Sequence, residues 1–78
     1  MKDFDFDTEY TGMAFRFDIK GMQNEFPDLA PFDGRYGTID SIEIEVGGVF
    51  EDNYWNVVFD DGERLEGISG IHLILLDL

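Results

Sequence analysis

Apolar and polar residues alternate along much of this chain, and a two-residue period predicts β-strands. In residues 3–10, Phe4, Phe6 and Tyr10 fall on one face of such a strand, and the opposite face is acidic. The same period returns over residues 13–20 after a Thr-Gly pair, which is typical of a turn. We therefore expect the two segments to pair as an N-terminal hairpin.

The alternation stops between residues 21 and 37, where two prolines and three glycines interrupt the chain. This composition predicts a long connection rather than a further strand. A short helical turn over residues 22–26 would make the fold α+β, and the pattern leaves that alternative open.

Residues 38–46 predict a strand in which Ile39 is out of phase with the apolar residues that follow it. A β-bulge near Asp40 and Ser41 would reconcile the two phases, because a bulge inserts one extra residue into a strand. Three later side chains are expected to share one face of this strand: Ile42, Ile44 and Val46.

The last third of the chain predicts three more strands. Residues 54–60 alternate and lead into Asp61-Gly62, a pair that tolerates the positive φ of a tight hairpin turn. Residues 64–68 form the return strand. Residues 71–78 are apolar on nearly both faces, so they predict a last strand that is covered on both sides. The pattern as a whole predicts a mainly β fold built on a small antiparallel sheet.

The second half of the chain, residues 34–76, also carries glycines and apolar residues at characteristic spacings. In chain order these are Gly34-x-x-Gly37-Thr38-Ile39, then Trp55-x-Val57-x-Phe59-Asp60-Asp61-Gly62, then His72-Leu73-Ile74-Leu75. This order resembles the SH3-like barrels, a family that includes Tudor and KOW modules. The resemblance implies a partly open SH3-like barrel. That family binds ligands through aromatic cages or basic loops, and the loops here are acidic, so neither ligand class carries over.

Length and composition restrict the classes of protein. Seventy-eight residues allow a single domain, 1–78, with one modest core. There is no cysteine, the acidic N-terminus is unlike a signal peptide, and no apolar run approaches the roughly 20 residues of a membrane span. We therefore expect a cytoplasmic protein with no membrane association. The net charge of -13 predicts a surface that repels nucleic acid and attracts basic proteins.

Candidate catalytic and metal-binding residues are few. Asp3, Asp5 and Asp7 match the first positions of a calcium loop, but the glycine and the final glutamate of such a loop are missing. His72, the only histidine, lies between apolar residues, which favours a buried side chain bonded to backbone over a general base. No phosphate loop, nucleophile motif or metal triad is present. The sequence therefore predicts no enzyme activity, no cofactor and no metal site.

The charge exceeds the magnitude of about 2 to 8 that keeps a small domain soluble. A compact chain of this length is roughly 30 Å across, and duplex DNA carries roughly 18 charges over that span. The chain has eighteen carboxylates, and alternate residues of a strand stand about 6.7 Å apart, so rows of acids can imitate phosphates. The predicted DNA-mimic surface comprises Asp3, Asp5, Asp7, Glu9, Asp40, Glu43, Glu45, Glu51, Asp52, Asp60, Asp61 and Glu63.

In size and composition the chain resembles the small acidic DNA-mimic proteins that phages make early in infection. These include anti-restriction proteins, uracil-glycosylase inhibitors, anti-CRISPR proteins and an inhibitor of the bacterial nucleoid protein HU. The resemblance implies takeover of the host through a basic, HU-like DNA-binding partner in the bacterial nucleoid. The alternatives are one of the other targets in this group, or an SH3-like adaptor that binds a basic peptide or protein.

We also expect a homodimer, because the C-terminal segment has more apolar side chains than one face of so small a core can cover. The residues concerned are Ile71, Leu73, Leu75 and Leu78.

Overall fold

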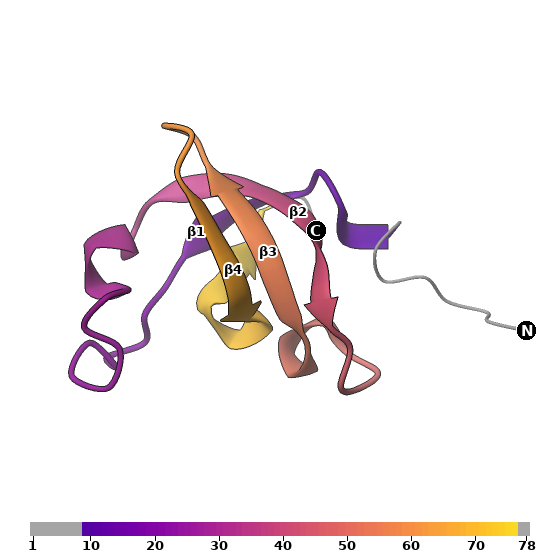
Figure 1. Ribbon diagram of the computed structural model, residues 1–78, viewed down its shortest axis with the longest axis horizontal. Coiled ribbons are helices and arrows are strands. Elements are labelled where there is room, and N and C mark those ends of the chain that lie inside the picture. Colours follow the sequence, from indigo (N-terminus) through magenta and orange to yellow (C-terminus); the bar gives the residue numbers. More distant parts are fainter. Residues whose placement is uncertain (1–8, 77–78) are drawn as a thin grey trace, which may run out of the picture.

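The computed structural model describes residues 9–76, and their regular structure consists mainly of strands (Figure 1). The strands are β1 (Ala14–Phe17), β2 (Tyr36–Ile44), β3 (Tyr54–Phe59), β4 (Arg64–Ser69) and β5 (Leu73–Leu75). Single turns of 3-10 helix lie between them: η1 (Ala30–Phe32), η2 (Phe50–Asp52) and η3 (Gly70–His72). The prediction of a mainly β fold is confirmed.

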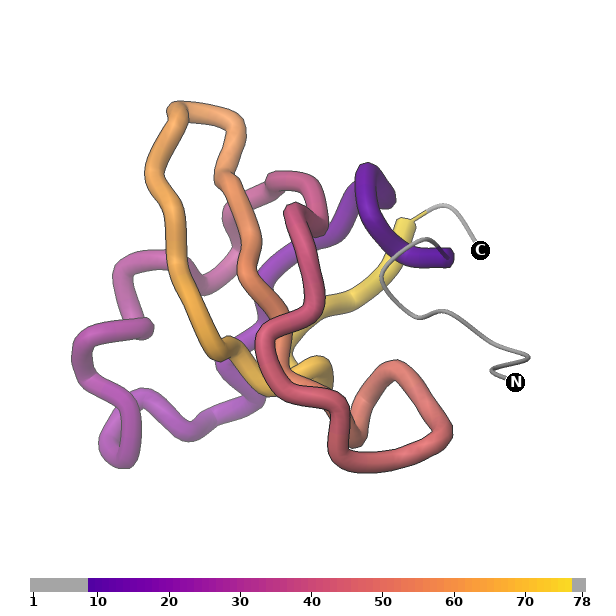
Figure 2. The backbone as a smooth tube through the Cα atoms, turned by 45° about the vertical axis from the view of Figure 1, so that its right-hand side comes forward, coloured from indigo at the N-terminus to yellow at the C-terminus, as the bar shows by residue number. Residues whose placement is uncertain are grey.

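The strands form one antiparallel sheet in the order β4-β3-β2-β1-β5. The first four follow the chain as a meander, and β5 returns to lie beside β1 (Figure 2). Among the described residues β4 and β5 are the two edges of this open sheet. The small antiparallel sheet is therefore as predicted, and β1 lies within it although the sequence resemblance began only at residue 34.

Residues 13–20 were predicted to belong to an N-terminal hairpin, and for this segment the prediction is wrong. β1 pairs with β2 on one side and with β5 on the other, so both of its edges are occupied. Residues 3–8 of the other predicted strand lie outside the described residues, and Glu9 and Tyr10 lie in a helical turn. The Tyr10 ring packs against the core, with its centroid 4.9 Å from that of Phe50.

A long connection joins β1 to β2, as predicted, and it consists of successive turns. The N–H of Phe26 donates to the carbonyl of Met22 at 2.9 Å, so the helical turn predicted over 22–26 is a single hydrogen-bonded turn. Earlier in the connection, a carboxylate oxygen of Asp18 accepts the N–H of Lys20 at 2.8 Å. That bond supports the left-handed conformation of Lys20, whose φ is 56°.

The bulge predicted in β2 is present. Ile39 pairs with Val57 and Ser41 pairs with Asn56, so Asp40 is the extra residue between them. The extra residue restores the phase, which lets Ile39 be almost fully buried while later residues of β2 continue the ladder.

A second irregularity in β2 lies between Ile42 and Ile44, and no feature of the sequence signals it. Ile42 packs against the core, whereas Ile44 is 53% exposed and Val46 is 65% exposed. The prediction that these three side chains share one face is therefore wrong, because the extra residue at Glu43 reverses the alternation after it.

The last strand is shorter than the predicted 71–78, because η3 precedes it and β5 contains only three residues. The side-chain oxygen of Ser69 accepts the N–H of Ile71 at 3.4 Å, which favours a turn at this point. Gly70 passes so close to η2 that a Cβ atom there would lie 3.0 Å from the Cα of Glu51. The apolar run therefore begins as a turn rather than as a strand.

The core is rich in aromatic side chains. Trp55, Val57 and Phe59 face inward from β3, as their alternation predicted. The buried apolar residues are Phe15, Phe17, Ile19, Phe32, Ile39, Phe50, Trp55, Val57, Phe59, Ile68 and Leu73.

Candidate partner-binding surface

Acidic side chains of the predicted DNA-mimic set lie on the surface of the folded chain. Nine of them belong to the described residues, and every one of the nine is exposed: Glu9, Asp40, Glu43, Glu45, Glu51, Asp52, Asp60, Asp61 and Glu63. The remaining three lie outside the described residues: Asp3, Asp5 and Asp7.

One group of acids occupies the hairpin between β3 and β4, where Gly62 adopts the positive φ of 94° that the turn requires. Arg35 reaches this hairpin from the β1–β2 connection and pairs with Asp61 and, at 3.2 Å, with Glu63. The guanidinium lies over the Phe59 ring, 5.1 Å from its centroid. Arg35 therefore fixes the position of two carboxylates and reduces their net charge.

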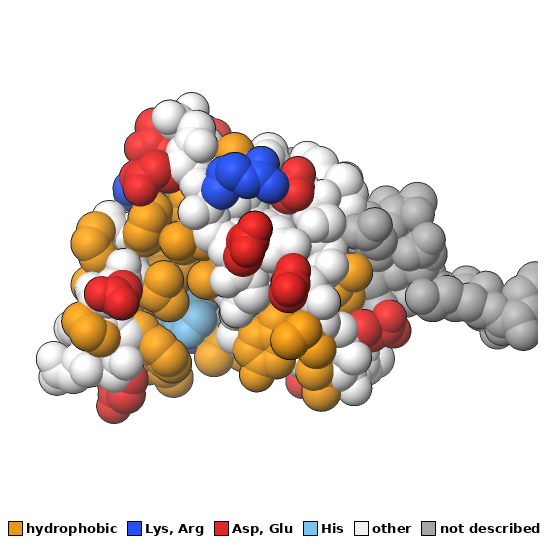
Figure 3. Space-filling view, viewed as in Figure 1, with side chains coloured by type: hydrophobic (Ala, Val, Ile, Leu, Met, Phe, Trp, Pro, Cys, Tyr) orange, Lys and Arg blue, Asp and Glu red, His pale blue; other side chains and the backbone are white. Residues whose placement is uncertain are grey.

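A second group lies on the outer side of the sheet. The bulge residue Asp40 pairs with Arg64 of β4 at 3.1 Å. Beside it, the Asn56 amide donates to a carboxylate oxygen of Glu43 at 2.9 Å, and the Asn56 carbonyl accepts the N–H of Gly67 at 3.1 Å. These bonds join three strands across a polar face, on which red and blue side chains are visible between apolar ones (Figure 3).

The acids do not form one continuous patch. The acids of η2 precede β3 and the acids of the β3–β4 hairpin follow it. The six residues of β3 therefore separate the η2 acids from the hairpin acids by about 20 Å. The predicted row of Glu43 and Glu45 is also interrupted, because the register shifts at Glu43 and β2 ends at Ile44. The negative surface therefore consists of separate groups, and Glu9 lies apart from them in sequence, in the helical turn before β1.

An apolar hollow of about 460 Å³ lies between the β1–β2 connection and the end of β4. Figure 3 shows apolar side chains around it and the His72 ring, the only histidine, in its floor. His72 is 3% exposed, and its Nδ1 lies 2.9 Å from the carbonyl oxygen of Asp18. The predicted buried histidine bonded to backbone is confirmed. The hollow is lined by Met22, Phe26, Leu29, Tyr54, Gly67, Ile68, Ser69, Ile71 and His72.

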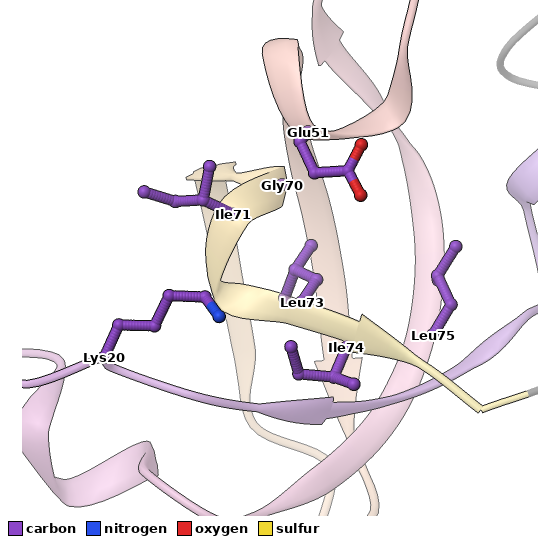
Figure 4. A pocket seen from close by; sticks show the side chains of 7 residues that line it. All are labelled: Lys20, Glu51, Gly70, Ile71, Leu73, Ile74 and Leu75. Atoms are coloured by element: carbon purple, nitrogen blue, oxygen red, sulfur yellow. The ribbon is translucent and has the colours of Figure 1, made fainter.

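A second hollow, of about 520 Å³, lies beside β5 (Figure 4). Ile74 and Leu75 of β5 line it, and Glu51 and Lys20 come from different segments on opposite sides of it. Leu73, one of the residues from which a homodimer was predicted, is buried in the core of the single chain. The C-terminal segment therefore leaves fewer apolar side chains for a dimer interface than the sequence suggested.

Sequence reasoning missed the side chains that organise these features. Arg35 and Asn56 carry no motif, and their contacts become visible only when distant segments meet. Phe26 and Tyr54 did carry a signal, because both are large aromatic residues outside the inward-facing alternation. Each is about two-fifths exposed, at 43% and 39%, on the rim of the apolar hollow.

In the described part of the chain, no three or more His, Asp or Glu side chains lie together in a way that could hold a metal ion. None of the helical segments between residues 9 and 76 is long and apolar enough to cross a membrane. Comparison with protein-family models, with curated proteins and with solved structures gave no match.

Proposed function

We propose that this protein is a DNA mimic that binds a basic DNA-binding protein, of the HU-like class, and occupies the surface that DNA would contact. Exposed carboxylates would take the positions of phosphates opposite Lys and Arg side chains of the partner. Both proteins would release bound ions on association, so the affinity falls steeply as salt rises.

The exposure of the acids is the observation that carries this proposal. All nine described members of the predicted set are exposed, so none is buried to support the fold. The chain has eighteen acids and only five Lys and Arg, and the resulting self-repulsion opposes compactness. A surface that keeps so much charge of one sign suits electrostatic capture of a basic partner.

The ion pairs within the surface add preorganisation. The Arg35 guanidinium lies over the Phe32 and Phe59 rings, whose centroids are 4.8 and 5.1 Å from its carbon, and it pairs with the hairpin carboxylates of Asp61 and Glu63. Acids held in place lose less conformational freedom on binding than free side chains do. The Lys and Arg residues of a partner would therefore meet carboxylates whose spacing is already set.

A gel-shift competition tests the proposal. Labelled DNA is bound to purified bacterial HU, and increasing amounts of the acidic protein are added at low and at physiological salt. We expect free DNA to be released, and less of it at the higher salt. DNA that stays fully bound at every concentration would contradict the proposal.

The apolar hollow favours a second candidate, an SH3-like adaptor that binds a basic protein without displacing its DNA. Its lining is mostly apolar and holds no Asp, Glu, Lys or Arg, so it is suited to recognising a side chain rather than a row of cations. In the same gel shift, an adaptor would form a slower band that contains both proteins and the DNA.

We also propose that two copies associate through the β5 side of the sheet. The hollow of Figure 4 has Lys20 on one side and Glu51 on the other. In a two-fold pair, Lys20 of one copy would face Glu51 of the second copy, and Glu51 of the first would face Lys20 of the second, because such an interface uses the same patch twice.

A further inference from the structure

His72 lines the apolar hollow between the β1–β2 connection and β4, and one of its two ring nitrogens has no partner among the described residues. His72 is 3% exposed, and its ring stacks on Phe17 with a centroid distance of 5.5 Å. Phe26 meets the same ring edge-on, with a centroid distance of 5.8 Å. These contacts fix the imidazole in the floor of the hollow.

The hydrogen bond to Asp18 sets the tautomer of this imidazole. A backbone carbonyl oxygen only accepts, so the Nδ1 of His72 must carry the hydrogen of the 2.9 Å bond. In the neutral ring Nε2 is then an acceptor. Of the two ring nitrogens only Nδ1 has a partner among the described residues, and none of their side-chain N or O atoms is both fully buried and unpaired. Nε2 is therefore not fully buried, and the hollow is the opening that the ring lines.

The lining restricts what this acceptor can bind. No carboxylate lines the hollow, so a guanidinium or ammonium group would lose its hydration there without gaining a counterion. A purely apolar group would enter but would leave Nε2 without a donor. The ligand that satisfies both is an aromatic ring with one N–H or O–H, and the exposed rings of Phe26 and Tyr54 at the rim suit edge or face contact with it.

We propose that this hollow receives a tryptophan or tyrosine side chain of the basic partner protein, and that His72 Nε2 accepts its hydrogen bond. The inference rests on the proposed function for the identity of the partner. Large aromatic side chains in pockets commonly supply most of the energy of an interface, while charges set the rate of encounter. The hollow would give an electrostatic mimic the specificity that charge density alone lacks.

An NMR titration of the ¹⁵N-labelled protein with single amino-acid amides tests the site without any partner protein. N-acetyl-tryptophanamide and N-acetyl-tyrosinamide are compared with N-acetyl-phenylalaninamide, which has the same backbone amides and whose side-chain ring carries no hydrogen-bond donor. We expect the first two to shift the His72 Nε2 resonance and to bind about 2- to 10-fold more tightly than the third, as one added hydrogen bond implies. Equal binding of all three, or no binding, would overturn the proposal.

Two variants and a matched control complete the test. Phe26→Ala removes a rim residue that is 43% exposed, so the fold should survive, and we expect weaker binding of all three amides. Val46→Ala removes an apolar residue that is 65% exposed and is not part of the lining, so binding should not change. His72→Phe keeps a ring to stack on Phe17 but removes the acceptor, so the preference for the donor-bearing amides should disappear.

The same titration distinguishes a side chain of a partner protein from a small molecule as the ligand of the hollow. Free indole that binds more than about tenfold more tightly than its amino-acid amide would indicate a site for a small aromatic molecule and would overturn the proposal. Because the amides are tested without a partner protein, the hollow can prove unable to bind them while the protein still displaces DNA. The two proposals are therefore distinguished by their own measurements.

Discussion

The side-chain oxygen of Asn53 accepts the backbone N–H of Val46 at 2.6 Å, across the loop that joins β2 to β3. The same oxygen accepts the N–H of Gly47 at 3.0 Å, and the amide nitrogen donates to the carbonyl of Val49 at 2.9 Å. Asn53 is fully buried, so this one side chain replaces the water that the loop backbone would otherwise need. It also fixes the start of β3, from which Trp55 enters the core.

Replacing Asn53 with Ala should therefore destabilise the fold. Two backbone N–H groups and one carbonyl lose their partner, so we expect a loss of about 2–4 kcal/mol in the free energy of unfolding. Urea denaturation followed by the fluorescence of Trp55, the only tryptophan, measures it. Asn24→Ala, at an exposed asparagine, is the control and should change stability by less than about 0.5 kcal/mol. A loss below 1 kcal/mol at Asn53 would show that the loop finds other partners.

Gly37 of β2 lies opposite Phe59 of β3, with no room for a side chain. A Cβ atom there would lie 2.8 Å from the Cα of Phe59 and 3.0 Å from the Phe15 ring. We expect Gly37→Ala to lose about 3 kcal/mol or more, or to prevent folding, because the obstacle is backbone that cannot move aside. Circular dichroism and urea denaturation measure the effect.

Gly48→Ala is the matched control for that substitution. A Cβ atom at Gly48 meets nothing within 4 Å, and its φ is not in the left-handed region. Its stability should stay near that of the wild type. If the two alanine variants were equally stable, the close packing of β2 on β3 at Gly37 would be refuted.

Arg35 should stabilise the fold mainly through its position over aromatic rings. Its carboxylate partners Asp61 and Glu63 have side chains 54% and 58% exposed, and pairs so exposed contribute little. We expect Arg35→Ala to lose about 1–2 kcal/mol, through lost contact with Phe32 and Phe59, and Arg35→Met to lose less. Urea denaturation at low salt and at 1 M salt separates the causes. A loss that vanishes at 1 M salt would assign the effect to the ion pairs instead.

The proposed dimer makes a prediction about mass. Light scattering should give twice the 9.0 kDa of one chain. Leu75→Asp should yield a monomer, because the new charge would lie in the hollow beside β5. Val46→Asp adds the same charge at an exposed apolar residue outside that hollow and should leave the dimer intact. A well-folded wild-type protein of 9.0 kDa would contradict the dimer.

The sequence predicted those parts of the fold that depend on local pattern. The bulge at Asp40 followed from the phase of Ile39, and the hairpin turn at Asp61-Gly62 followed from the φ angles these residues tolerate. The second bulge, at Glu43, depends on how β2 bends against β3, and no local signal encodes it. The turn η3 was missed because Ile71 and His72 continue directly into the apolar run that predicted the last strand.

The candidate surface was predictable in its residue types but not in its arrangement. Counting acids identified exposed side chains, because isolated carboxylates are seldom buried. Counting could not show that Arg35 would pair with Asp61 and Glu63, 26 and 28 residues away. The apolar hollow was also missed, since residues of the β1–β2 connection, the end of β4 and η3 line it together and lie far apart in the sequence.

The most direct test of DNA mimicry compares two variants of equal charge in the HU competition. One removes three acids of the predicted surface that pair with no cation among the described residues: Glu51→Gln, Asp52→Asn and Asp60→Asn. The other removes three exposed acids outside that surface: Glu25→Gln, Asp28→Asn and Glu66→Gln.

The measured quantity is the protein concentration that displaces half of the labelled DNA from HU. We expect the first variant to raise it about tenfold, since three exposed ion pairs are lost, and the second to raise it less than about threefold. Equal displacement by the wild type and by both variants, or an equal loss in both variants, would contradict a surface that presents its acids as phosphates.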